Sequence, residues 1–281
     1  MATIIDGKAL AAKCKNEVKI AVASMEQKPK LAVIQVGEDP ASQVYVKNKR
    51  KDCEECGILS EEFGLPADYG QEALLKVIRS LNERKDIDGV LCQLPLPAGY
   101  DYDEETVLLV IDPRKDVDAF HPYNVGHVMI GDPSFLPCTP AGVIRMLDEY
   151  EISVEGKHCV VVGRSNIVGK PMAMLLLHRN GTVTVCHSLT PDLAAITRQA
   201  DILISAVGRR NVITADMVKE GAVIIDVAMN RNEQGKLCGD VDFEPVSQVA
   251  SYITPVPGGC GPMTRAILME NTLRAAVAHG K

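Results

Sequence analysis

Residues 160–171 join an apolar run to a helical segment, which is where a phosphate-binding turn would lie. Gly163 permits a tight turn there, and Gly169 permits close packing of a helix on its strand. Pro171 favours a helix start whose free N–H groups can face phosphate. Ser165 replaces the middle glycine of the usual dinucleotide fingerprint, so the motif alone also fits a plain strand-to-helix turn.

The next apolar run ends at His187 and Ser188, where NAD-specific folds usually carry an acidic residue for the ribose 2′-hydroxyl. Neutral hydrogen-bonding side chains, with Arg164 on the preceding loop, would accept a 2′-phosphate. This pattern favours NADP over NAD. The alternative is that His187 and Ser188 simply end a strand at the surface.

Two later loops also follow apolar strands. One runs from Ala206 to Gly208, and the other from Asp226 through Met229 to Asn230. Ligands of open α/β sheets bind at the carboxyl ends of the strands. Either loop alone could be a structural turn, but both together indicate a cofactor-binding edge.

A second group of polar residues lies in the first half of the chain. Tyr45 and Lys49 are four residues apart in a helical segment and therefore share a face, although a solvated basic face is the default reading of Lys49 alone. Gln93 interrupts a buried apolar run, and a buried amide without partners is costly, which makes it a candidate site residue. Asp116 and Asp118 lie in a charged loop that would otherwise be read as a turn.

The segment 254–264, Thr-Pro-Val-Pro-Gly-Gly-Cys-Gly-Pro-Met-Thr, is unusual in composition. Its glycines and prolines define a backbone path immediately before a helix, so that a flat ligand could approach the main chain. A disordered linker is the alternative, but the apolar flanks and the short length argue against it.

Short β-branched runs alternate with helical segments, which predicts α/β architecture with largely parallel sheets. The alternating strand and helix segments become shorter and more closely spaced after about residues 140–155, which indicates a domain boundary there. The predicted strands are 31–36, 89–94, 159–162, 182–186, 202–205 and 223–227, and the predicted helices are 40–56, 71–84, 139–150, 170–179, 193–199 and 263–279.

Composition excludes several classes of protein. The chain has 281 residues, 46% of them hydrophobic, and a net charge of -7 without a basic run, so neither nucleic acid nor a membrane is an expected partner. The N-terminus has no secretory pattern, and nine scattered cysteines suggest reduced thiols in the cytoplasm. Cys53 and Cys56 have a metal-like spacing without further ligands nearby, so no metal site is expected.

Six motifs in order resemble the bifunctional methylenetetrahydrofolate dehydrogenase/methenyltetrahydrofolate cyclohydrolase family, over about residues 3–277. They are Tyr45-x-x-x-Lys49, Gln93-Leu-Pro-Leu-Pro97, Lys115-Asp-Val-Asp118, Pro137-Cys-Thr-Pro-x-Gly142, Gly163-Arg-Ser-x-x-Val-Gly-x-Pro171 and Pro257-Gly-Gly-x-Gly-Pro-Met-Thr264. The resemblance implies two α/β domains around a cleft, the second with a Rossmann-like parallel sheet, and a C-terminal helix returning to the first. It implies a folate-binding domain of 1–140 plus 263–281, an NADP-binding domain of 141–262, and a homodimer paired through the cofactor domain.

The implied activity is oxidation of 5,10-methylene-tetrahydrofolate with NADP, followed by hydrolysis of the methenyl product to 10-formyl-tetrahydrofolate. By resemblance, Lys49 is the base or hydrogen-bond donor, Gln93 orients it, Tyr45 packs on the folate and Asp118 anchors the pterin. The residues that would contact folate also include Pro257, Gly258, Gly261 and Pro262. Those that would face NADP are Gly163, Arg164, Ser165, His187, Ser188, Ala206, Gly208, Met229 and Thr264.

Three positions depart from the family pattern. Cys260 replaces a usual valine, Ala119 a usual glycine, and Ala228-Met229 a usual Gly-Ile. Two other functions stay open: a dehydrogenase with little cyclohydrolase activity, and a folate- or nucleotide-binding protein without turnover. The presence of both Lys49 and Asp118 argues against them.

Overall fold

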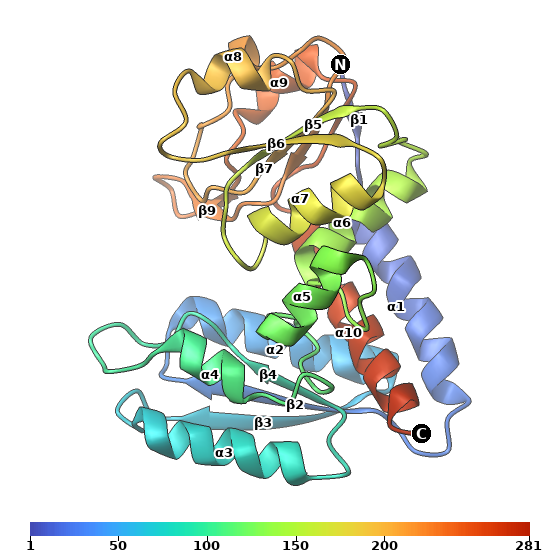
Figure 1. The fold of residues 1–281 in the computed structure, drawn as a ribbon, viewed down its shortest axis with the longest axis vertical. Helices are drawn as coiled ribbons and strands as arrows, with labels where there is room; N and C mark the ends of the chain where they lie inside the picture. The colour runs from blue at the N-terminus through green and yellow to red at the C-terminus, as the bar shows by residue number, and fades with distance from the viewer. The chain divides into compact units, whose positions relative to one another are not determined.

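The computed structural model describes residues 1–39 and 43–281 in full, and residues 40–42 only as part of a helix. The chain divides into two compact units (Figure 1). The six-stranded unit comprises Met1–Ala12 and Pro137–Thr264, and the three-stranded unit comprises Lys13–Leu136 and Arg265–Lys281. Both divisions fall inside helices, α1 (Gly7–Ala23) and α10 (Cys260–Ala278).

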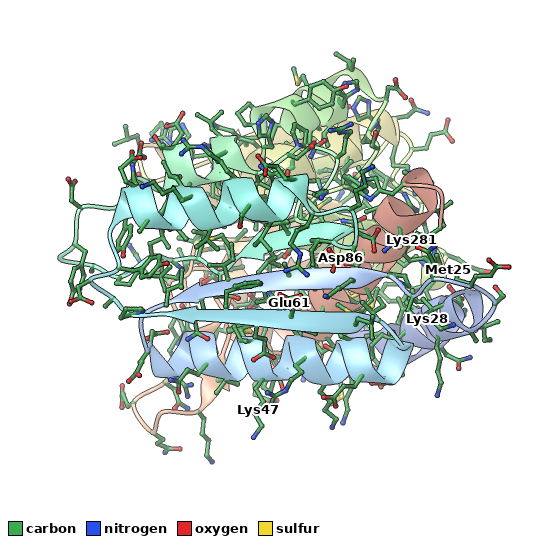
Figure 2. The ribbon with its side chains drawn as sticks, turned by 90° about the horizontal axis from the view of Figure 1, so that it is seen from below. Met25, Lys28, Lys47, Glu61, Asp86 and Lys281 are labelled. Atoms are coloured by element: carbon green, nitrogen blue, oxygen red, sulfur yellow. The ribbon has the colours of Figure 1, made fainter. Side chains whose placement is uncertain are left out.

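The three-stranded unit is built on a parallel sheet in the order β3-β2-β4. Helices α2 and α3 cover opposite faces of this sheet (Figure 2). Apolar side chains of β2, β4 and α3 form its core, because both faces of the central strand are buried. The elements are β2 (Lys30–Val36), α2 (Pro40–Cys56), β3 (Leu59–Leu65), α3 (Gln71–Glu83), β4 (Gly89–Cys92), α4 (Glu104–Val110) and α5 (Pro122–Ile130).

The six-stranded unit contains a parallel sheet in the order β1-β11-β8-β7-β5-β6. Helices α6 and α7 lie on one face, and α8 and α9 lie on the other (Figure 1). The strands are β1 (Thr3–Ile4), β5 (His158–Val162), β6 (Thr182–Cys186), β7 (Ile202–Ser205), β8 (Val223–Asp226) and β11 (Tyr252–Ile253). The other elements are α6 (Cys138–Glu149), α7 (Gly169–His178), α8 (Leu193–Thr197), η1 (Ala215–Met217), the hairpin β9 (Asn230–Arg231) with β10 (Leu237–Cys238), and α9 (Phe243–Val249).

The order of the six-stranded sheet determines where a ligand can bind. Taken from β5 onward, the strands lie in a doubly wound order that changes direction between β5 and β7. Ligands of such sheets bind outside the carboxyl ends of the strands at this switch point. The loops after β5 and β7 are therefore expected to carry the cofactor.

The α/β fold class predicted from the alternating pattern is confirmed. The helix 40–56 and the strands 182–186 and 202–205 have the predicted bounds, while most other elements differ by a few residues. The C-terminal helix was predicted to start at residue 263, but it begins at Cys260, because Pro262 needs no backbone donor in a first helical turn.

Two local expectations differ from the structure. The helix predicted for residues 139–150 begins one residue earlier, because α6 starts at Cys138 after Pro137, with no side-chain cap. The first 140 residues were expected in one domain, yet Thr3 and Ile4 pair with β11 of the six-stranded sheet. β3 was not predicted because it is an edge strand whose charged residues leave no buried apolar run.

The amino ends of the short sheet carry an ion-pair network. Lys30 Nζ lies 2.6 Å from Glu61 Oε2 and 3.0 Å from Asp86 Oδ2, and Arg84 pairs with the same two carboxylates (Figure 2). Hydrogen bonds from Arg84 and Lys30 lower the pKa of Glu61 to about 2. These charges stand at the amino ends of the strands, whereas the residues with predicted chemistry follow the carboxyl ends.

Among the described residues, no helix has the length and apolar character that a membrane crossing requires.

Candidate active site

Lys49 and Gln93 meet in the three-stranded unit. Lys49 Nζ, on α2, donates a hydrogen bond to Gln93 Oε1 at 3.0 Å. The Gln93 amide nitrogen donates to the Leu94 carbonyl at 2.6 Å, and the Gln93 backbone N–H donates to the Ile34 carbonyl at 2.8 Å. The backbone bond continues the β2–β4 pairing by one residue, so the sheet itself orients the amide toward the lysine. Tyr45 is half-buried one turn before Lys49 on the same helix.

Asp118 ends a loop whose backbone is held at several points. The Val90 N–H donates to the Lys115 carbonyl at 2.7 Å, which attaches the loop to β4. The Asn271 amide, from α10, donates to the Val117 carbonyl at 2.8 Å. Lys115 is buried, and its Nζ donates to three carbonyls where α3 ends, at 2.6 to 3.1 Å. These contacts leave the backbone before Asp118 little freedom.

Charged residues around the end of β4 affect the pKa of the buried Cys92 thiol. Burial raises its pKa to about 12. Glu104 and Asp118 add to the rise, and Lys49 opposes it. Lys49 and Asp118 therefore both act on the same buried sulfur, so the structure brings the predicted amine and carboxylate into one neighbourhood.

Ala119, directly after Asp118, has a φ of 58° and is fully buried. This left-handed conformation suits glycine, which explains the usual glycine of the family pattern at this position. The alanine methyl group is buried in the core of the protein at this position.

The predicted phosphate turn has the glycine geometry that its sequence requires. Gly163 has a φ of 130°, and a Cβ there would overlap the carbonyl oxygen of Ala206. A Cβ on Gly169 would overlap the Gly163 carbonyl. Ser165 Oγ accepts hydrogen bonds from the N–H groups of Val168 and Gly169, at 3.2 and 3.3 Å, where α7 begins. Both glycines are therefore sterically required, and Ser165 stabilises the turn by accepting hydrogen bonds from N–H groups at the start of α7.

The ends of β5 and β6 are adjacent because Val162 pairs with Cys186. Arg164 and Ser188 are exposed in the loops that follow these two strands. His187 instead stabilises its own turn, since its Nδ1 accepts from the Leu189 N–H at 3.2 Å. The edge thus offers an exposed guanidinium and hydroxyl with no carboxylate at the strand end.

Residues 254–264 form a short turn and the first turn of α10. The Val256–Pro257 peptide bond is cis, and Gly258 has a φ of 116°. Cys260 is buried, and burial raises the pKa of its thiol. Thr264 shares a hydrogen bond of 2.9 Å with the Thr139 hydroxyl, which joins α10 to α6.

Two buried aspartates were missed as site residues by the sequence analysis. Asp226 ends β8, and Asp240 follows the β9–β10 hairpin; their side chains bond the loops after β7 and β8. Burial raises the pKa of Asp226 to about 6. The available signal was the Gly239-Asp240 pair placed directly before the apolar Val241.

The fold and these loops define a class: two-unit α/β proteins with a dinucleotide-binding type of sheet in one unit and a lysine–glutamine pair in the other. Two family models match the chain. The tetrahydrofolate dehydrogenase/cyclohydrolase catalytic domain matches residues 5–118, and the NAD(P)-binding domain of the same family matches residues 137–280. The chain belongs to the tetrahydrofolate dehydrogenase/cyclohydrolase family.

Similar proteins agree with this assignment. The bifunctional protein FolD of Acetivibrio thermocellus is 56% identical over 283 residues, which cover 100% of this chain and 99% of that protein. The crystal structure of the bifunctional FolD methylenetetrahydrofolate dehydrogenase/cyclohydrolase of Campylobacter jejuni has a TM-score of 0.96 and 52% identity, covering 99% of both chains. The Trypanosoma brucei enzyme, solved with NADP cofactor and an inhibitor, has a TM-score of 0.94 and 39% identity, covering 99% of this chain and 98% of that one.

Proposed function

We propose that this chain oxidises 5,10-methylene-tetrahydrofolate with NADP and hydrolyses the methenyl product to 10-formyl-tetrahydrofolate. The observation that carries the proposal is the hydrogen bond between Lys49 Nζ and Gln93 Oε1, at 3.0 Å, in the unit that contains the match to the family's catalytic domain. The second step needs a group that handles a proton, and this pair supplies one.

The carboxyl edge of the six-stranded sheet fits NADP. Gly163 and Ala206 leave the switch point free of large side chains, while Arg164 and Ser188 provide a cation and a hydroxyl for a 2′-phosphate. When bound, NADP supplies the hydride acceptor. Further predicted contacts of the cofactor are Ser165, His187, Gly208, Met229 and Thr264.

Lys49 is proposed to act in the hydrolysis. Two nitrogens flank the substrate carbon and can expel a hydride, so the oxidation needs positioning more than a base. The oxidised product is a cation, to which water must add with loss of a proton. Gln93 holds the Lys49 amine in place for that proton transfer, and it does so by accepting one of the hydrogens on Nζ.

Asp118 is proposed to bind the pterin. An ionised carboxylate offers two acceptors to the paired N–H donors of a 2-amino-4-oxo ring. The held backbone before Asp118 supports this role, since a fork-like pair of hydrogen bonds requires a defined orientation. We further propose that Tyr45 packs on the folate and that Pro257, Gly258, Gly261 and Pro262 contact it.

The remaining expectations stay proposals. We infer a homodimer paired through the NADP-binding domain. We also infer that the chain acts in the cytoplasm, which is supported by nine cysteines that are all free thiols. The folate-binding role is assigned to the predicted domain 1–140 plus 263–281, apart from its first strand, which pairs with the six-stranded sheet. The NADP-binding role is assigned to the predicted domain 141–262.

The test compares Lys49→Met with Lys47→Met. Lys47 is exposed on the same helix and points away from the sheet (Figure 2), so it controls for the loss of one positive charge on α2. Each protein receives 5,10-methylene-tetrahydrofolate with NADP, and the reduced cofactor and the methenyl chromophore are followed together.

The parent protein and Lys47→Met should reduce NADP without accumulating methenyl beyond its spontaneous hydrolysis. Lys49→Met should retain some reduction and accumulate methenyl. Equal loss of both steps in Lys49→Met would refute the assignment of Lys49 to hydrolysis. Methenyl accumulation by the parent would indicate a dehydrogenase alone, and a parent without reduction would indicate a binding protein.

A further inference from the structure

Asp240 is a buried carboxylate at the centre of the cofactor edge. The residue has no exposed surface. Its Oδ2 accepts hydrogen bonds from Ser205 Oγ at 3.0 Å, from the Val207 N–H at 2.7 Å and from the Gly208 N–H at 3.3 Å. Its Oδ1 accepts from the Arg209 N–H at 2.7 Å.

The same Oδ1 also accepts from the Asn230 side-chain amide at 3.0 Å. Asn230 immediately follows Met229, so one carboxylate contacts the loops after both β7 and β8. Three of its five donors are consecutive backbone N–H groups, which form a concave anion site of the kind called a nest. A nest needs an acceptor to offset the aligned N–H dipoles, and here the protein provides its own.

The neighbouring aspartate extends this arrangement. Asp226 Oδ1 accepts from the Ala228 N–H at 3.1 Å, and Oδ2 accepts from the Val241 N–H at 2.8 Å. A Cβ on Gly239 would overlap the Asp226 carboxylate, so only glycine lets the chain pass from the hairpin to Asp240. The geometry therefore depends on the Gly239-Asp240 pair.

We propose that Asp240 is a positioning residue for NADP, because its carboxylate holds the loop 206–209 and the Asn230 side chain in the conformation that the cofactor binds. This inference rests on the proposed function in that it takes the loop after β7 as part of the NADP site. It adds a residue that does not itself face the predicted cofactor surface and acts through the loop.

The substitution Asp240→Asn tests this role with little change in volume. An amide offers one acceptor and introduces a donor opposite N–H or NH₂ groups that are themselves donors. The lost charge-assisted bonds should weaken NADP binding at least about tenfold. The matched control is Asp242→Asn. It removes a carboxylate charge two residues away from Asp240, and the Asp242 side chain makes no helix-cap hydrogen bond to α9.

Two readouts do not depend on turnover with the cofactor. The dissociation constant for NADP is measured by calorimetry. Trypsin cleavage after Arg209 and Arg210, which are exposed in this loop, is followed by mass spectrometry without cofactor. Asp240→Asn should bind NADP more weakly and be cleaved faster at these two arginines, while Asp242→Asn should match the parent in both.

Hydrolysis of methenyl-tetrahydrofolate supplied directly, without NADP, serves as the control for folding. Asp240→Asn should retain this activity within about twofold of the parent, because Lys49 and Gln93 belong to the three-stranded unit. Loss of hydrolysis together with NADP binding would overturn the proposal, since Asp240 would then support the whole fold. An unchanged dissociation constant and cleavage rate would overturn it as well.

A milder variant gives a second test. Ser205→Ala removes one donor to the same carboxylate and leaves the three loop N–H bonds in place. It should raise the dissociation constant for NADP by a smaller factor than Asp240→Asn and slightly increase cleavage; no change in either would contradict the proposal. If the parent itself failed to bind NADP, the proposed function would fail, whereas the cleavage comparison would still decide whether Asp240 holds the loop.

Discussion

Asp116 provides a test of the electrostatics beside the proposed pterin anchor. It is 2% exposed, and its Oδ2 accepts from the His121 N–H at 2.8 Å and from the Asn124 amide at 2.9 Å. These bonds favour the ionised carboxylate, but burial opposes it more strongly, and the nearby Asp118 adds to that opposition. The result is a pKa raised to about 6. Asp116 should therefore make folding stability fall as the pH rises.

The sign and size of the effect follow from proton linkage. The unfolded chain releases this proton near pH 4, whereas the folded protein retains it until about pH 6. In that interval the folded state binds more protons, so the free energy of unfolding falls by about 1.4 kcal/mol for each pH unit. Between about pH 4.5 and about pH 7.5 the integrated loss is about 2 kcal/mol.

Asp116→Asn removes this titration while keeping one oxygen to accept both hydrogen bonds. Relative to the parent, the variant should therefore gain about 2 kcal/mol in free energy of unfolding between about pH 4.5 and about pH 7.5. The measurement is urea unfolding followed by circular dichroism at both pH values. All other titrating groups are common to the two proteins, so their contributions cancel in the comparison.

Asp112→Asn is a pH-independent control in the same loop. The hydrogen bonds from Arg114 lower the pKa of Asp112 below its usual value near 4, so its stabilising contribution is lost only at pH values below about 4. Between about pH 4.5 and about pH 7.5, the difference in free energy of unfolding between this variant and the parent should therefore stay nearly constant. A difference for Asp116→Asn that is equally independent of pH, or that falls as the pH rises, would show that burial does not dominate at Asp116.

Three further substitutions test other parts of the site. Gly163→Ala should weaken NADP binding at least about tenfold, measured by calorimetry, because a Cβ would overlap the Ala206 carbonyl; unchanged binding would contradict the geometry of the turn. Lys115→Met should reduce the free energy of unfolding by at least about 3 kcal/mol in urea titration, because three carbonyls lose a buried cationic donor, and a smaller loss would mean that water replaces it. Arg164→Ala should weaken NADP more than NAD in parallel binding assays, and equal weakening would refute the 2′-phosphate argument.

The local elements were largely predictable because their signals are local. The end of the helix 40–56 was predictable because Gly57 follows it directly. The strands 182–186 and 202–205 were predictable because each is a short apolar run between turn residues. The glycine requirement at 163 was also predicted from the turn that its position demands. Gln93 was identified because a polar amide in a buried run needs a partner, and the structure supplies Lys49.

Sequence alone determined the fold class, the alternation of elements and most of the candidate residues, since periodicity and turn chemistry depend on neighbours along the chain. Only the tertiary structure decided that the first strand, β1, joins the six-stranded sheet, because the pairing of Thr3 with Tyr252 leaves no signal in the neighbouring sequence. It also decided the roles of Lys115, Asp226 and Asp240. Each has a charged side chain that is buried because backbone groups converge on it, which the sequence does not show.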